Sequence, residues 1–86
     1  MVATMYETIN EPIKVLVSFA QQKMQPLVFS WRGRKYPIKK INLVHWQKQG
    51  NDKLYHFSVS DDANYFKLSF STRDFSWRLE ELYTEG

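Results

Sequence analysis

Apolar and polar residues alternate along much of this chain, with the period of two that is typical of a β-strand with one buried face. Five segments follow this alternation. Their apolar positions are Ile13, Val15, Val17 and Phe19; Phe29 and Trp31; Tyr55, Phe57 and Val59; Phe66, Leu68 and Phe70; and Phe75, Trp77 and Leu79. Clusters of Gly, Asn, Asp and Ser separate most of the segments, and these residues favour tight turns. The pattern therefore predicts half-buried strands joined by hairpins.

A sixth segment, residues 36–47, is less regular. Its apolar positions change parity near Lys39 and Lys40. One extra residue in a strand moves all later side chains to the other face, so the sequence predicts a β-bulge near these two lysines. Pro37 cannot donate to a strand ladder, which indicates a strand start or a sheet edge.

Together the segments predict an all-β, single-domain protein. Consecutive strands with short turns indicate an antiparallel meander of about six strands over residues 12–84, preceded by a tail at residues 1–11. Such a sheet has to cover its aromatic face, so we expect it to curl into a small barrel or roll.

Residues 12–24 allow a second interpretation. Asn10, Glu11 and Pro12 resemble a helix start, and the apolar residues that follow also fit a helical spacing. A strand is favoured because Val15, Val17 and Phe19 would be exposed or crowded on that helix. One helical turn after the last strand is also open.

The 86 residues include six Phe, five Tyr and three Trp, but no Cys. The stability must therefore come from apolar burial, without a disulfide or a thiolate metal site. All three tryptophans, Trp46 among them, are expected in the core. The main buried residues are predicted to be Phe29, Trp31, Tyr55, Phe57, Phe66, Leu68, Trp77 and Leu79, with Val15 and Val17 beside them.

No stretch approaches the roughly 20 apolar residues that span a bilayer. The first ten residues contain no Lys or Arg and lack the apolar middle of a signal peptide. The expected location is cytoplasmic, without membrane contact.

The net charge is +3, from 12 basic and 9 acidic residues, and the cations concentrate in the middle of the chain. A basic surface beside exposed rings can bind nucleic acid, the cations contacting phosphates and the rings stacking on bases. The predicted contacts to nucleic acid or another anion are Arg32, Arg34, Lys35, Lys39, Lys40 and Lys48. Tyr36, Tyr55 and Tyr65 are the candidates for exposed rings.

Several of these residues form a pattern that resembles a known family. The pattern comprises Pro12-Ile13-Lys14-Val15, then Pro26, Phe29, Trp31, Gly33, Arg34 and Tyr36, and later Ile41, Trp46, Trp77, Leu79 and Tyr83. It resembles a small uncharacterised bacterial β-domain that occurs alone or at the C-terminus of Y-family, translesion DNA-polymerase-like proteins. The resemblance implies an all-β fold and an association with DNA metabolism, and it carries no catalytic residues over.

Nothing in the sequence indicates catalysis. His45 and His56 are the only histidines, and without Cys they do not make the three or four ligands of a zinc site. The serines lack a nucleophile-elbow motif, and Asp61-Asp62 lies in a predicted turn where neither carboxyl is buried. We therefore expect no enzyme activity and no cofactor.

Two functions remain. The first is a nucleic-acid-associated accessory module that binds single- or double-stranded nucleic acid through its basic surface. The second is a protein-interaction or assembly module, which pairs with a partner or with itself through an exposed strand edge or an uncovered aromatic face.

Overall fold

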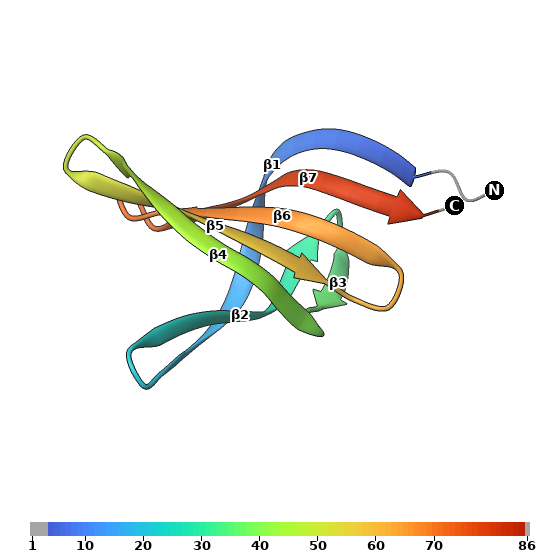
Figure 1. Ribbon diagram of the computed structural model, residues 1–86, viewed down its shortest axis with the longest axis horizontal. Coiled ribbons are helices and arrows are strands. Elements are labelled where there is room, and N and C mark those ends of the chain that lie inside the picture. Colours follow the sequence, from blue (N-terminus) through green and yellow to red (C-terminus); the bar gives the residue numbers. More distant parts are fainter. Residues whose placement is uncertain (1–3, 86) are drawn as a thin grey trace.

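The computed structural model describes residues 4–85, which form a single antiparallel sheet of seven strands (Figure 1). The strands are β1 (Thr4–Ala20), β2 (Lys23–Trp31), β3 (Arg34–Pro37), β4 (Lys40–Gln49), β5 (Asp52–Ser60), β6 (Asn64–Ser71) and β7 (Ser76–Glu85). The all-β prediction is confirmed. The part of the chain that the structure describes contains no helix, and so none that could cross a membrane.

The strand count differs from the predicted six because the irregular segment 36–47 contains two strands. β3 ends at Pro37, and β4 begins at Lys40. Lys39 donates its backbone N–H to Ser60 of β5, while Ile38 donates its own to Leu27 of β2, at 3.0 and 2.8 Å. This short connection thus joins the two edges of the sheet at one end.

The strand order is β3-β2-β1-β7-β6-β5-β4. Consecutive strands are neighbours throughout, except that β3 and β4 are the two edges, and β1 pairs with β7. An up-and-down barrel of seven strands would need one further pairing, between β3 and β4. Among residues 4–85 this pairing is absent, so the predicted meander curls but stays open.

β1 is long and bent. Its first part, from Thr4 to Ile13, pairs with β7, and its second part, from Lys14 to Ala20, pairs with β2. The register shifts between Thr8 and Glu11, and Asn10 has a φ of 52°. This irregularity turns the chain, so that β2 and β3 lie across the sheet from β4 and β5 (Figure 1).

Three predictions about the ends of the domain can now be compared with the structure. The segment that was open between strand and helix is a strand with a two-residue turn at Gln21 and Gln22. Residues 1–11 were assigned to a tail, but residues 4–11 form part of β1. A helical turn after the last strand is wrong, since β7 continues to Glu85.

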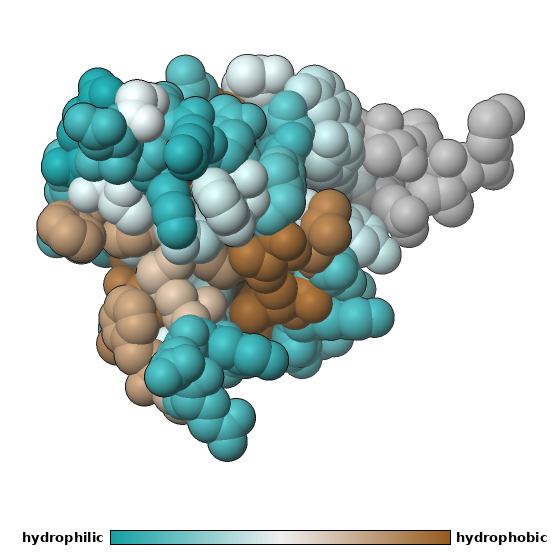
Figure 2. All heavy atoms as spheres, turned by 60° about the vertical axis from the view of Figure 1, so that its left-hand side comes forward, coloured by the Kyte–Doolittle hydropathy of each residue, from teal (hydrophilic) through white to brown (hydrophobic). Residues whose placement is uncertain are grey.

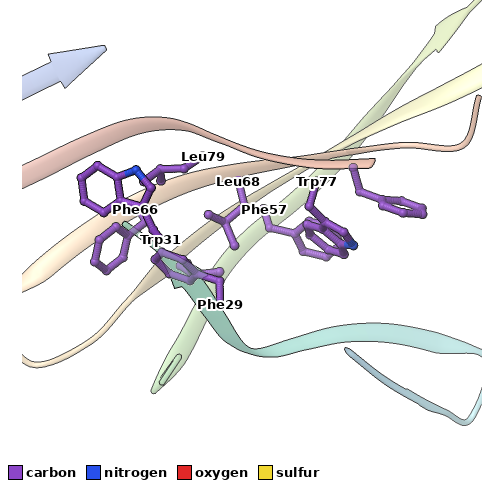
Figure 3. Packing of buried hydrophobic residues seen from close by; sticks show 9 residues of the cluster. Phe29, Trp31, Phe57, Phe66, Leu68, Trp77 and Leu79 are labelled. Carbon is purple, nitrogen blue, oxygen red and sulfur yellow. The ribbon is translucent and has the colours of Figure 1, made fainter. Parts of the chain in front are cut away.

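The core lies between the two halves of the curled sheet. Its buried apolar side chains are Phe29, Trp31, Phe57, Val59, Phe66, Leu68, Phe70, Trp77 and Leu79. Figure 3 shows them as a row that runs from Trp31 and Phe66 past Leu68 to Phe57 and Trp77. Seven of the eight predicted main core residues are buried, while Tyr55 and the flanking Val15 and Val17 are partly buried.

Two aromatic predictions were wrong. Trp46, expected in the core, is 50% exposed. Tyr36, expected to present an exposed ring, packs against the core and stacks on Phe29 with ring centroids 5.0 Å apart. Of the other two candidate rings, Tyr65 is exposed and Tyr55 is partly buried.

The predicted bulge is two residues away from its expected position. The register of β4 against β5 shifts between Ile41 and Leu43, so Asn42 is the extra residue. Ile41 is opposite the buried Val59, and Val44 is opposite the buried Phe57. The bulge therefore places Val44 on the concave face of the sheet, and Trp46 follows it there.

Candidate functional site

The six predicted anion contacts do not gather on one surface. Arg32 belongs to the β2–β3 turn, Arg34 and Lys35 to β3, and Lys39 to the β3–β4 connection. Lys40 and Lys48 lie near opposite ends of β4. They are eight positions apart on an extended strand, which is about 26 Å at roughly 3.3 Å per residue.

Two of the six cations are already bound by carboxylates. The Arg32 guanidinium lies 2.7 Å from Glu11 and 4.5 Å above the ring of Trp31, whose indole N–H also donates to Glu11. The hydrogen bond from Arg32 lowers the pKa of Glu11, and the hydrogen bond to Glu11 raises that of Arg32. Lys39 is 2.6 Å from Asp62. Arg32 therefore ties the β2–β3 hairpin to β1, and both cations already have a carboxylate partner within the domain.

A different site lies beside the unpaired outer edge of β4. A groove of about 660 Å³ opens between the β1–β2 hairpin and strands β4 to β6. Its apolar lining consists of Phe19, Met24, Val44, Tyr55, Phe57 and Phe70. Figure 2 shows a hydrophobic band between two hydrophilic regions of the surface. We call the groove the slot.

β4 forms one wall of the slot and is an edge strand. From Leu43 to Gln49 it pairs residue by residue with β5, without further irregularity. Its other edge has no partner in residues 4–85. In an antiparallel strand, alternate residues direct their N–H and C=O groups to that free side. β4 thus offers a row of backbone donors and acceptors above an apolar groove.

The side chains of β4 are unusually open for a strand of a small domain. Val44 is 47% exposed even though it is on the concave face, because no strand covers it from the β3 side. Trp46 is opposite Tyr55 and is half exposed for the same reason. Leu43, on the convex face, is exposed as well.

Two lysines lie beside Trp46, which follows the slot residue Val44 on the same face of β4, and a third lines the slot. Lys48 is directly opposite Lys53 in the β4–β5 ladder, and the Lys53 ammonium lies 4.5 Å above the Trp46 ring. Lys23 lines the slot from the β1–β2 hairpin. None of these three lysines forms an ion pair with a carboxylate whose side chain the structure describes. The slot therefore has apolar walls and one lining cation, Lys23, and two further cations lie near it beside Trp46.

The histidines lie together on the convex face. The rings of His45 and His56 stack with centroids 4.8 Å apart, and Nδ1 of His56 is 3.0 Å from Glu80 Oε2. Sequence reasoning treated them as ordinary strand residues and missed Glu80. Among residues with described side chains there is no group of three or more His, Cys, Asp or Glu that could hold a metal ion.

The register of the β4–β5 hairpin was available from the sequence. Residues equidistant from the Gly50-Asn51 turn face each other, which pairs Trp46 with Tyr55 and Lys48 with Lys53. The convergence of His56 and Glu80 carried no such signal. The register of β7 skips a position at Glu80, since Glu81 is opposite Lys67 while Leu79 is opposite Leu68.

The geometry defines a class of protein: a small open β-sheet whose edge strand β4 has one unpaired edge beside an apolar groove. No protein-family model, curated protein or solved structure matches this chain.

Proposed function

We propose that this domain is a protein-interaction module without enzymatic activity, which binds an extended segment of another protein by strand addition to β4. The observation that carries the proposal is the missing β3–β4 pairing, in a sheet whose other neighbouring strands are all paired. A bound segment would take the place of the absent neighbour.

Strand addition would use both the backbone and the slot. Each hydrogen bond between the added segment and β4 contributes about 1 kcal/mol net, so several are needed for useful affinity. Alternate side chains of the segment would face the slot and cover Val44 and Trp46, which the fold leaves half exposed. Backbone pairing supplies affinity in this mode, and the slot supplies selectivity.

The nucleic-acid function is the second candidate. An exposed tryptophan beside Lys48 and Lys53 can stack on a base while the cations contact phosphates. The resemblance to domains of DNA-polymerase-like proteins points in the same direction. We place it second because Lys53 already covers one face of the Trp46 ring and the six predicted cations are dispersed.

A selection experiment tests the proposal. Random twelve-residue peptides displayed on phage are selected on the immobilised domain and on a Val44→Asp variant, which puts a charge into the slot. Tyr65→Ala is the matched control, because Tyr65 is also exposed but is not among the residues that line the slot. We expect enriched peptides that alternate apolar and polar residues, bind the control and fail on the Val44 variant.

The binding mode has its own check. N-methyl groups on alternate residues of a selected peptide remove the backbone donors that face β4 while the side chains stay. We expect one of the two alternating methylation patterns to abolish binding and the other to be tolerated. The absence of any enrichment, or equal binding of both methylated peptides, would contradict strand addition. Tight binding of oligo-dT that weakens steeply with salt would favour the second candidate.

A further inference from the structure

We infer that the segment bound at β4 is acidic, with two apolar side chains and one carboxylate at alternate positions, facing Val44, Trp46 and Lys48 respectively. This inference rests on the function proposed above and specifies the chemistry of the partner.

The first step is the face on which these side chains lie. Val44 is opposite the buried Phe57, and Trp46 is opposite Tyr55, which packs against the core. Successive side chains alternate between the faces of a strand, so Lys48 follows Val44 and Trp46 on the concave face. A segment paired to β4 would present its own alternate side chains on this face, one beside each of the three.

The second step is the charge at the third position. Lys48 and Lys53 are directly opposite each other, and like charges in that arrangement destabilise a sheet. The nearest acidic residue along the chain, Asp52, accepts a hydrogen bond from Arg73 at 3.2 Å. Lys53 lies above Trp46 instead of meeting a carboxylate. A carboxylate delivered beside Lys48 would meet both ammonium groups and relieve their repulsion.

A second copy of this chain does not fit as the strand donor. The edge strands β3 and β4 contain Arg34, Lys35, Lys40 and Lys48, and neither strand contains an acidic residue. Antiparallel pairing of two β4 strands about Val44 would place Lys40 of each copy opposite Lys48 of the other. Lysines on a sheet edge are a known device against edge-to-edge association. The donor is therefore a different, acidic chain.

Lys23 strengthens the argument from a different element. It comes from the β1–β2 hairpin, on the other side of the slot, and lines the same groove. Lys23 thus adds a cation that lines the groove from β2 to the pair on β4 and β5, which lies beside Trp46. If the lysines served only to prevent association through the edge strand β4, the lysine on β2 would not be needed.

The experiment uses a peptide from the selection and its matched partner, identical except that the Glu beside Lys48 is replaced by Gln. Affinities are measured by fluorescence anisotropy at 50 and 300 mM salt. Partly exposed ion pairs are modest, so we expect the Glu peptide to bind about threefold to tenfold more tightly at low salt, and the difference to shrink at high salt.

Two variants assign the preference to the slot. Lys48→Glu should abolish or reverse the preference for the Glu peptide. Lys35→Glu makes the same change in net charge on the opposite edge strand, and it should leave the preference intact. Circular dichroism checks that both variants keep the fold.

The outcomes separate the inference from the proposed function. Equal binding of the Glu and Gln peptides, or selected peptides without an acidic residue, would overturn the inference and leave strand addition standing. A preference lost equally in the Lys48 and Lys35 variants would also overturn it, since long-range charge would then be the cause. If no peptide is enriched on the domain, the proposed function is contradicted, and the inference with it.

Discussion

Trp77 and Trp46 allow one side-chain type to be tested in two environments. Trp77 is 8% exposed, and its ring lies 4.9 Å from that of Phe70 and 5.4 Å from that of Phe57. It belongs to β7, an interior strand that pairs with both β1 and β6. Truncation of Trp77 to Ala would leave a void that strands on both sides cannot easily fill.

The expected loss is large relative to the stability of the domain. Replacement of a buried Trp or Phe by Ala typically costs about 3–5 kcal/mol. At about 0.05–0.15 kcal/mol per residue, a chain of 86 residues has roughly 4–13 kcal/mol in total. A change of 1 kcal/mol shifts the Tm of a domain of this size by about 4–8 °C. We therefore expect Trp77→Ala to lower the Tm by at least about 12 °C or to prevent folding.

Trp46→Ala is the matched control. Half of this residue is already in water, so burial of roughly 75–125 Å² at about 25 cal/mol per Å² gives a loss of about 2–3 kcal/mol, and no cavity adds to it because no strand covers the ring. Urea denaturation followed by far-UV circular dichroism measures both variants, and Trp77→Phe keeps the comparison possible if Trp77→Ala does not fold. Similar losses for Trp46→Ala and Trp77→Ala would refute the burial argument.

Three smaller effects follow from local geometry. Phe75 has a φ of 57° and is 75% exposed, so Phe75→Gly should keep or raise stability in urea denaturation, by up to about 1 kcal/mol. Lys48→Glu should stabilise the protein by about 0.2–1 kcal/mol in the same assay, because it replaces a repulsive pair with Lys53 by an attractive one. The hydrogen bond from Arg32 lowers the pKa of Glu11. The ionised Glu11 therefore stabilises the fold fully above the ordinary carboxyl pKa, and this stabilisation is lost as the pH falls through the lowered pKa. Glu11→Gln should flatten the acid side of the curve of Tm against pH.

The strands could be predicted well because burial of one face of a strand makes apolar and polar residues alternate along the sequence. Phe29, Phe57, Phe66 and Leu79 all lie where that alternation placed them. The same rule failed for Trp46, since parity identifies the face of a side chain but not whether anything covers that face. In this sheet no strand packs over Trp46, because β3 and β4 do not pair.

The dispersal of the six predicted anion contacts has a different cause. A β-strand advances about 3.3 Å per residue, so cations that are close in the sequence lie far apart when the chain is extended. Lys40 and Lys48 are separated in this way, although they belong to one strand. Lys48 and Lys53 meet because a hairpin folds them together. Hairpin symmetry about Gly50-Asn51 is thus a better guide to charge clusters here than proximity in the sequence.

The open edge of β4 can be traced to the short segment before it. β3 has four residues and ends at Pro37, which has no N–H to donate to a neighbouring strand. A strand of this length cannot cover β4, which has ten residues. Chain length and proline therefore both oppose closure of the sheet. The slot is a direct consequence, because the side chains that closure would have buried, Val44 and Trp46, stay available to a strand from another protein.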